Sequence, residues 1–140
     1  MDTQAHTGQA NTSSSSAIDT SFEPAFYRVD AIREVSLLEG ISARFVTGSH
    51  IMFSFVRLAP GAIMPDHNHP HEQLGYVVEG SMVLNLAGDE RTLQPGDAYA
   101  IPGGVTHRAV GGPNGCLVLD AFNPPREEYL ERARRAAQAE

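Results

Sequence analysis

The chain has 140 residues, enough for one domain with a real core and too few for two ordinary domains. Hydrophobic residues make up 41% and charged residues 19%, a globular composition that excludes a chain disordered throughout. There are 10 basic and 17 acidic residues, so the formal net charge is −7, and we expect no nucleic-acid partner. Apolar stretches fall short of a membrane helix and the first residues lack a secretory pattern, so we expect a cytoplasmic protein with no membrane partner.

Residues 1–21 are dominated by Ser, Thr, Gln, Asn and small residues, with Ile18 as the one large aliphatic side chain. Such a segment buries too little apolar surface to offset its ordering entropy, so we predict a disordered low-complexity tail. The remaining residues, 22–140, are expected to form a single domain. Its only cysteine, Cys116, lies in an apolar run, which predicts a buried and unreactive thiol.

The middle of the chain has the pattern of an all-β protein with about eight to nine short strands. β-branched and aromatic residues alternate with turn signals, among them a hairpin at Glu79-Gly80-Ser81 and a type II turn at Pro95-Gly96. Closely spaced strands without intervening helices predict an antiparallel sandwich or barrel. The expected strands cover residues 41–46, 51–58, 74–78, 82–86, 90–93, 98–101, 106–110 and 116–122.

A short C-terminal helix is predicted over residues 125–138. Asn123 is the expected N-cap, and the acidic Glu127 and Glu128 fall where the helix dipole favours anions. Apolar residues recur at helical spacing and predict a face packed on the barrel exterior. They are Tyr129, Leu130, Ala133 and Ala137.

Three histidines cluster in the sequence Asp66-His67-Asn68-His69-Pro70-His71-Glu72-Gln73. His67 and His69 are two residues apart, so in an extended segment both rings point to the same face and could share a metal ion. Two alternatives stay open for the neighbouring position, because Gln73 shares this face while Glu72 should point away unless the loop slips at Pro70. His71 and His50 are interpreted as a solvated loop residue and a rim residue, although either could line a cavity mouth.

The spacing of glycines and histidines resembles the two motifs of the cupin superfamily. The first motif is matched at Gly61, His67, His69 and Gly80, and the second at Gly96, Pro102, Gly104 and His107. The resemblance implies a double-stranded β-helix, the cupin jelly-roll barrel, holding one divalent metal (Zn, Ni, Mn or Fe). It also implies His67, His69, Gln73 and His107 as ligands and a homodimer paired through sheet edges.

The stretch HNHPHEQLGYVVEG, together with a terminal D-x-F-x-P-P-R, is similar to the small cupins of pectin and alginate degradation. Members of that family convert 4,5-unsaturated uronates to linear 4-deoxy-5-keto uronic acids. The resemblance therefore implies an isomerase-type enzyme whose catalytic residues are Asp120, Phe122 and Arg126. The residue pattern is consistent with this assignment in one respect, since Asp120 and Phe122 share one face of the expected last strand. An ordinary strand end, a helix cap and a surface Arg–Glu pair remain the alternative.

Other functions stay open at this stage. They are an Fe(II)-dependent dioxygenase of a small aromatic or dicarbonyl compound, a polyketide cyclase, and a non-catalytic ligand-binding module. A cavity lined by Phe53, Phe55, Met64 and Leu84 would favour the cyclase. Three further residues, Tyr99, Arg57 and Asn85, are possible substrate contacts, although a surface or rim position is the favoured interpretation of each.

Overall fold

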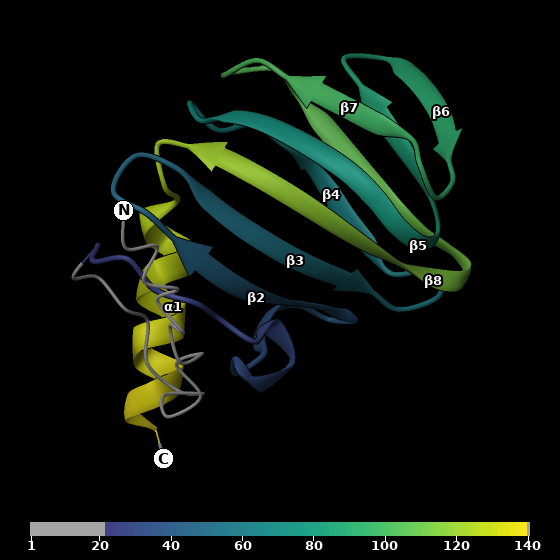
Figure 1. The fold of residues 1–140 in the computed structure, drawn as a ribbon. Coiled ribbons are helices and arrows are strands. Elements are labelled where there is room, and N and C mark those ends of the chain that lie inside the picture. The colour runs from purple at the N-terminus through teal and green to yellow at the C-terminus, as the bar shows by residue number, and fades with distance from the viewer. Residues whose placement is uncertain (1–21, 140) are drawn as a thin grey trace, which may run out of the picture.

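The structure, a computed structural model, describes residues 22–139 and consists mostly of antiparallel β-strands with one C-terminal helix (Figure 1). This confirms the predicted all-β class and the C-terminal helix. The predicted disordered tail, residues 1–21, lies outside the described residues. The elements are the 3₁₀ turn Val29–Ala31, β1 Val35–Leu38, β2 Ile41–Thr47, β3 Met52–Leu58, β4 Ile63–His67, β5 Glu72–Leu86, β6 Asp89–Leu93, β7 Ala98–Ile101, β8 His107–Asn123 and α1 Glu127–Gln138.

The strands form one antiparallel sheet in the order β1-β2-β3-β8-β5-β6, with β4 paired to β8 and β7 paired to β5. The two long strands β5 and β8 pair with each other, and each also pairs with two further strands. The first half of β5 pairs with β7 and its second half with β6, while β8 pairs with β4 at its start and with β3 at its end. The sheet is strongly curved, as the strands in Figure 1 show, and the apolar core lies on its inner face.

The predicted hairpin at Gly80 is wrong, because β5 runs through this position as one bent strand. Inward-facing residues are the odd-numbered Gln73, Gly75 and Val77 before the bend and the even-numbered Met82 and Leu84 after it. Register shifts against β8 between residues 77 and 82 produce this change of face. Local turn residues alone could not distinguish such a bulge from a chain reversal.

A matching bend in β8 joins the two strands predicted over residues 106–110 and 116–122. Strands β1 and β4 were not predicted, since both are short and β4 contains the Pro65-Asp66 pair that is unusual in strands. The type II turn at Pro95-Gly96 was predicted correctly, since Gly96 adopts φ +98° and Asp97 N–H donates to Gln94 O at 2.9 Å. The chain also reverses at Ala87-Gly88 between β5 and β6.

Helix α1 packs across one end of the sheet, beside β1 and β2 (Figure 1). Leu130 and Ala133 join the apolar core, and the ring of Tyr129 stacks on Phe45 with 5.4 Å between centroids. The helix begins two residues later than predicted, and its N-cap is Arg126 rather than Asn123, which is the last residue of β8. Among the described residues no helix is long and apolar enough to cross a membrane.

Candidate metal centre and active site

Three histidines that lie far apart in the sequence meet inside the barrel. His67 ends β4 and His107 begins β8, and the pairing of these strands sets the two residues opposite each other. His69 follows in the loop after β4. One ligand atom from each ring lies within 4.8 Å of the others, so the cluster can hold one metal ion. Its identity stays open, because imidazole suits several divalent metals.

Backbone carbonyl groups orient all three rings in the same way. Nδ1 of His67 lies 2.9 Å from Pro65 O, Nδ1 of His107 lies 2.9 Å from Val105 O, and Nδ1 of His69 lies 3.1 Å from His71 O. A carbonyl oxygen only accepts, so each Nδ1 carries the proton and each Nε2 presents a lone pair. This is the outer hydrogen bond that metal-binding histidines ordinarily make.

Two further observations fit a bound cation. Within residues 22–139, Nε2 of His107 is buried without a hydrogen-bond partner. Burial, with the positive charge of Arg126 and the proximity of His107, lowers the pKa of His69 to about 4. Burial likewise lowers the pKa of His107. Both rings are therefore neutral at pH 7, the state in which imidazole binds metals.

Gln73 lies inside the barrel beside this cluster, whereas Glu72 is exposed on the outer face. Side chains alternate between the two faces of β5, so Gln73 and not Glu72 faces the histidines, as the sequence favoured. Oε1 of Gln73 lies 3.1 Å from Nε2 of His69. With the His69 proton on Nδ1, these are two facing lone pairs, and a shared cation would satisfy both. The role of Gln73 as a fourth ligand stays a prediction.

The three residues expected to act on a substrate lie in the same cavity as His67 and His107. Asp120 and Phe122 point inward from the last residues of β8, and these two residues are 6% and 2% exposed. Arg126 follows at the N-cap of α1 and is 8% exposed. The end of β8, the helix cap at Arg126 and an Arg126–Glu128 ion pair are all present, as the ordinary interpretation expected, but Asp120, Phe122 and Arg126 are buried rather than at the surface. Polar side chains lining this cavity are His67, Gln73, Tyr99, His107, Asp120, Arg126 and Tyr129.

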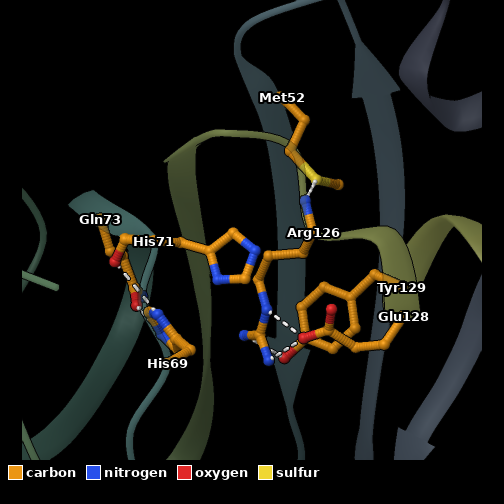
Figure 2. Close-up of polar contacts among 7 residues, drawn as sticks. All are labelled: Met52, His69, His71, Gln73, Arg126, Glu128 and Tyr129. Atoms are coloured by element: carbon orange, nitrogen blue, oxygen red, sulfur yellow. Dashed lines mark hydrogen bonds and ion pairs between the residues drawn. The ribbon is translucent and has the colours of Figure 1, made fainter. Parts of the chain in front are cut away.

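Arg126 is held from several sides, as Figure 2 shows. Its backbone N–H donates to the sulfur of Met52 at 3.0 Å, and its Nη1 donates to the hydroxyl of Tyr129 at 2.7 Å. The guanidinium carbon lies 3.8 Å from the centroid of the Tyr129 ring and 5.1 Å from that of Phe122. Nη2 also forms an ion pair with Glu128 at 2.7 Å. These contacts fix a cation at the cavity wall.

Asp120 is buried, and its carboxylate is hydrogen-bonded by two neutral side chains. Tyr99 donates its hydroxyl to Oδ1 at 2.5 Å, and Gln73 supplies a second side-chain hydrogen bond. Burial raises the pKa of Asp120 to about 6, against the opposing effects of these two hydrogen bonds and of Arg126. Burial, together with Asp120, raises the pKa of Tyr99, so that its hydroxyl keeps its proton.

Several residues lie elsewhere than the sequence suggested. Tyr99 was interpreted as a surface or rim residue but lines the cavity, because Gly75 opposite it on β5 leaves room for its ring. His71 was interpreted as solvated but is half-buried, with its ring 5.3 Å from that of His69 and beside Arg126 in Figure 2. Burial lowers the pKa of His71, against the opposing charge of Glu128.

Other candidate contacts lie outside the cavity. Arg57 is exposed, the side-chain oxygen of Asn85 accepts from Gly88 N–H at 2.9 Å, and His50 is exposed beside Ser49. Of the four residues that would favour a cyclase, Met64 and Leu84 line the cavity. Phe53 and Phe55 point to the other face of β3 and do not, because inward positions on this strand are the even-numbered ones.

The chain is similar to known cupins in sequence and in structure. A family model described as a cupin domain matches residues 54–119. The pectin degradation protein KdgF of Dickeya dadantii (strain 3937) is 35% identical over 94 residues, which cover 66% of this chain and 86% of that protein. The structure of KdgF from Halomonas sp. superposes with a TM-score of 0.73 at 33% identity, covering 77% of this chain and all of that one.

An RmlC-like cupin from Shewanella frigidimarina NCIMB 400 superposes with a TM-score of 0.71 at 29% identity, covering 76% of this chain and 96% of the other. The residues that the family model matches include all three histidines of the cluster. These matches confirm the resemblance and the barrel fold expected from the two motifs. The chain belongs to the cupin family and is a KdgF-like cupin.

Proposed function

We propose that this chain is a metal-dependent isomerase that converts a 4,5-unsaturated uronate to the linear 4-deoxy-5-keto uronic acid. The observation that carries the proposal is the convergence of Asp120 and Arg126 on one cavity with the three-histidine cluster. A carboxylate for proton transfer, a cation for the sugar carboxylate and a candidate metal centre are the groups this reaction requires. Similarity to a protein named for pectin degradation supports the same substrate class.

Arg126 is the residue that binds the sugar carboxylate in this proposal. A guanidinium pairs with a carboxylate through two parallel hydrogen bonds, which fixes the orientation of the sugar as well as its position. The chain carries a formal charge of −7, so an anionic substrate needs such a local cation. Phe122 lies beneath the guanidinium and keeps that side of it dry.

Asp120 moves the proton. Ring opening removes a proton from the hydroxyl on C1, breaks the bond between C1 and the ring oxygen, and leaves an aldehyde and an enol. The enol becomes a ketone at C5 when a proton is added at C4, so substrate and product have the same atoms and no co-reactant is needed. Because burial raises the pKa of Asp120 to about 6, its carboxyl group can both accept and return a proton near neutral pH.

His67, His69 and His107, with Gln73 as the predicted fourth ligand, would hold the metal. When bound, a divalent metal supplies Lewis-acid polarisation of the substrate's hydroxyl oxygens. The neutral Gln73 keeps the full positive charge at this centre, where a carboxylate would reduce it. This favours non-redox chemistry over the oxygenase alternative.

The test is anaerobic incubation of the metal-loaded protein with 4,5-unsaturated galacturonate, following loss of the double-bond absorbance and identifying the product by NMR. We expect rapid loss with the wild-type protein and none with His107→Ala. Equal absorbance traces for the two proteins would overturn the proposal, and a requirement for oxygen would replace it with the dioxygenase.

Two variants assign the roles of the residues. Arg126→Ala is expected mainly to raise KM, because it removes the partner of the sugar carboxylate. Asp120→Asn is expected mainly to lower kcat, on the order of 10²-fold or more, because it removes a proton-transfer group. Unchanged kinetics in both variants would reject these roles. The homodimer and the cytoplasmic location stay predictions.

A further inference from the structure

Tyr99 and Asp120 belong to one row of residues that crosses four strands. Asp120 on β8 pairs with Ser54 on β3 and with Gly75 on β5, and Gly75 pairs in turn with Tyr99 on β7. Tyr99 is therefore two strands away from Asp120. In a sheet, a side chain can contact a residue two strands away on the same face only if the residue between them is small.

Gly75 provides that space. A Cβ atom built on Gly75 would overlap the Tyr99 ring, at Cζ, Cε2 and the hydroxyl oxygen. The backbone of Gly75 has no positive φ that would call for glycine. The lack of a side chain at this position is therefore explained by the room the Tyr99 ring takes up over β5.

The ring extends across β5 to the one carboxylate in the cavity wall. The Tyr99 hydroxyl donates to Oδ1 of Asp120 at 2.5 Å, a short hydrogen bond of the kind formed with an ionised acceptor. Ser54, the neighbour of Asp120 on the opposite side, is fully buried, and its hydroxyl has no partner within residues 22–139. Tyr99 and Gln73 thus provide the side-chain hydrogen bonds that orient Asp120.

We propose that Tyr99 is a positioning residue for Asp120, holding one carboxylate oxygen across Gly75 so that the other oxygen faces the substrate. This inference rests on the proposed function. Tyr99 itself contacts Asp120 rather than the reacting atoms. Loss of its hydroxyl should let the carboxylate rotate, and an error of about 1 Å in placing a reacting group costs on the order of 10²-fold in rate.

The first test is Tyr99→Phe, which keeps the ring over Gly75 and removes the hydroxyl alone. We expect kcat to fall about ten- to hundredfold while KM, metal stoichiometry and melting temperature stay near the wild-type values. Tyr76→Phe is the matched control, because Tyr76 lies next to Gly75 on the exposed face, 47% exposed, and should leave all four quantities unchanged. A Tyr99→Phe enzyme with wild-type kcat would overturn the proposal.

A double-mutant cycle separates positioning from a merely structural role. If Tyr99 acts through Asp120, then Tyr99→Phe should cause no further loss of kcat in the Asp120→Asn background. Losses that multiply would show that the hydroxyl acts independently of Asp120, against the proposal. Gly75→Ala should reproduce the kcat loss of Tyr99→Phe, because the added methyl group displaces the ring.

An NMR measurement that needs no substrate tests the Tyr99–Asp120 contact separately from the proposed function. In protein carrying ¹³C-labelled aspartate, the carboxyl signal that Asp120→Asn removes should shift in Tyr99→Phe and stay in place in Tyr76→Phe. An unshifted signal would overturn the contact even in an active enzyme. If the wild-type protein turns over no uronate while the signal shifts, then the proposed function fails and the Tyr99–Asp120 contact stands.

Discussion

The guanidinium of Arg126 is paired with a carboxylate of the protein itself, since its Nη2 lies 2.7 Å from Oε1 of Glu128. The two side chains differ in burial, because Arg126 is 9% exposed and Glu128 is 53% exposed. Partial burial raises the pKa of Glu128, but hydrogen bonds and the charges of Arg126 and His71 outweigh this and lower it overall. Glu128 is thus an ionised carboxylate beside the guanidinium that, in the proposed reaction, binds the sugar carboxylate.

Glu128→Gln should therefore strengthen substrate binding, because the sugar carboxylate no longer competes with an internal one. Ion pairs with an exposed partner contribute about 0.2–1 kcal/mol, so we expect KM to fall by up to about fivefold with kcat unchanged. Steady-state kinetics with 4,5-unsaturated galacturonate measure this. Glu131→Gln is the matched control, since Glu131 pairs with Arg134 and Arg135 on the same helix. A higher KM in Glu128→Gln would mean that Glu128 orients Arg126 instead of competing.

Metal binding should depend on His107 and not on His50. The wild-type protein should take up about one divalent ion per chain, and a ligand at 100 times its Kd stabilises the folded state by about 2.7 kcal/mol. His107→Ala should lose this stabilisation, while His50→Ala, at an exposed position outside the cluster, should keep it. Elemental analysis and thermal melts with and without chelator provide the measurement. Equal metal content in the two variants would exclude the His67–His69–His107 site.

Alanine at Gly80 should destabilise the protein far more than alanine at Gly88. Both glycines have a positive φ, +73° and +96°, which costs an L-residue about 1–2 kcal/mol. At Gly80 a Cβ would also overlap the carbonyl oxygen of Gly115 in β8, whereas at Gly88 nothing lies within 4 Å. We expect losses of about 3 kcal/mol or more for Gly80→Ala and about 1 kcal/mol for Gly88→Ala. Urea unfolding measures both, and similar midpoints would contradict the close contact at the bend.

The Cys116 thiol should make stability fall at alkaline pH. Burial, with the charge of Asp120, raises its pKa from about 9 to about 11. Between these values the unfolded state has lost the thiol proton and the folded state still holds it, so the stabilisation is complete below pH 9 and lost as the pH rises through 11. Two pKa units correspond to about 3 kcal/mol. Wild type should lose that much more stability than Cys116→Ala over this range.

Thiol reactivity checks the same burial independently. A thiol reagent at pH 8 should label Cys116 only after denaturation, because the side chain is 5% exposed. Rapid labelling of the native protein would show that the middle of β8, where Cys116 pairs with Leu58 and Gly80, opens readily.

The bent strands illustrate which parts of the fold could be predicted. The apolar segments 74–78 and 82–86 were placed correctly as β structure, since their side chains alternate. Their connection was not, because a glycine with positive φ occurs both in hairpin turns and in bulged strands. The pairing of β5 with β8 over almost its whole length decides for the bulge, and that pairing is a long-range property.

The sequence by itself predicted the histidine cluster and favoured Gln73 over Glu72 as the inward residue. The two-residue repeat of extended chain placed His67, His69 and Gln73 on one face, and the resemblance to the cupin motifs added His107. The tertiary structure alone decided the surroundings of Asp120 and Arg126. Tyr99 reaches Asp120 because Gly75 stands between them in the sheet, and the backbone N–H of Arg126 reaches Met52 because the end of β8 pairs with the start of β3. Such contacts depend on strand register and on the size of the residue in between, which no local pattern records.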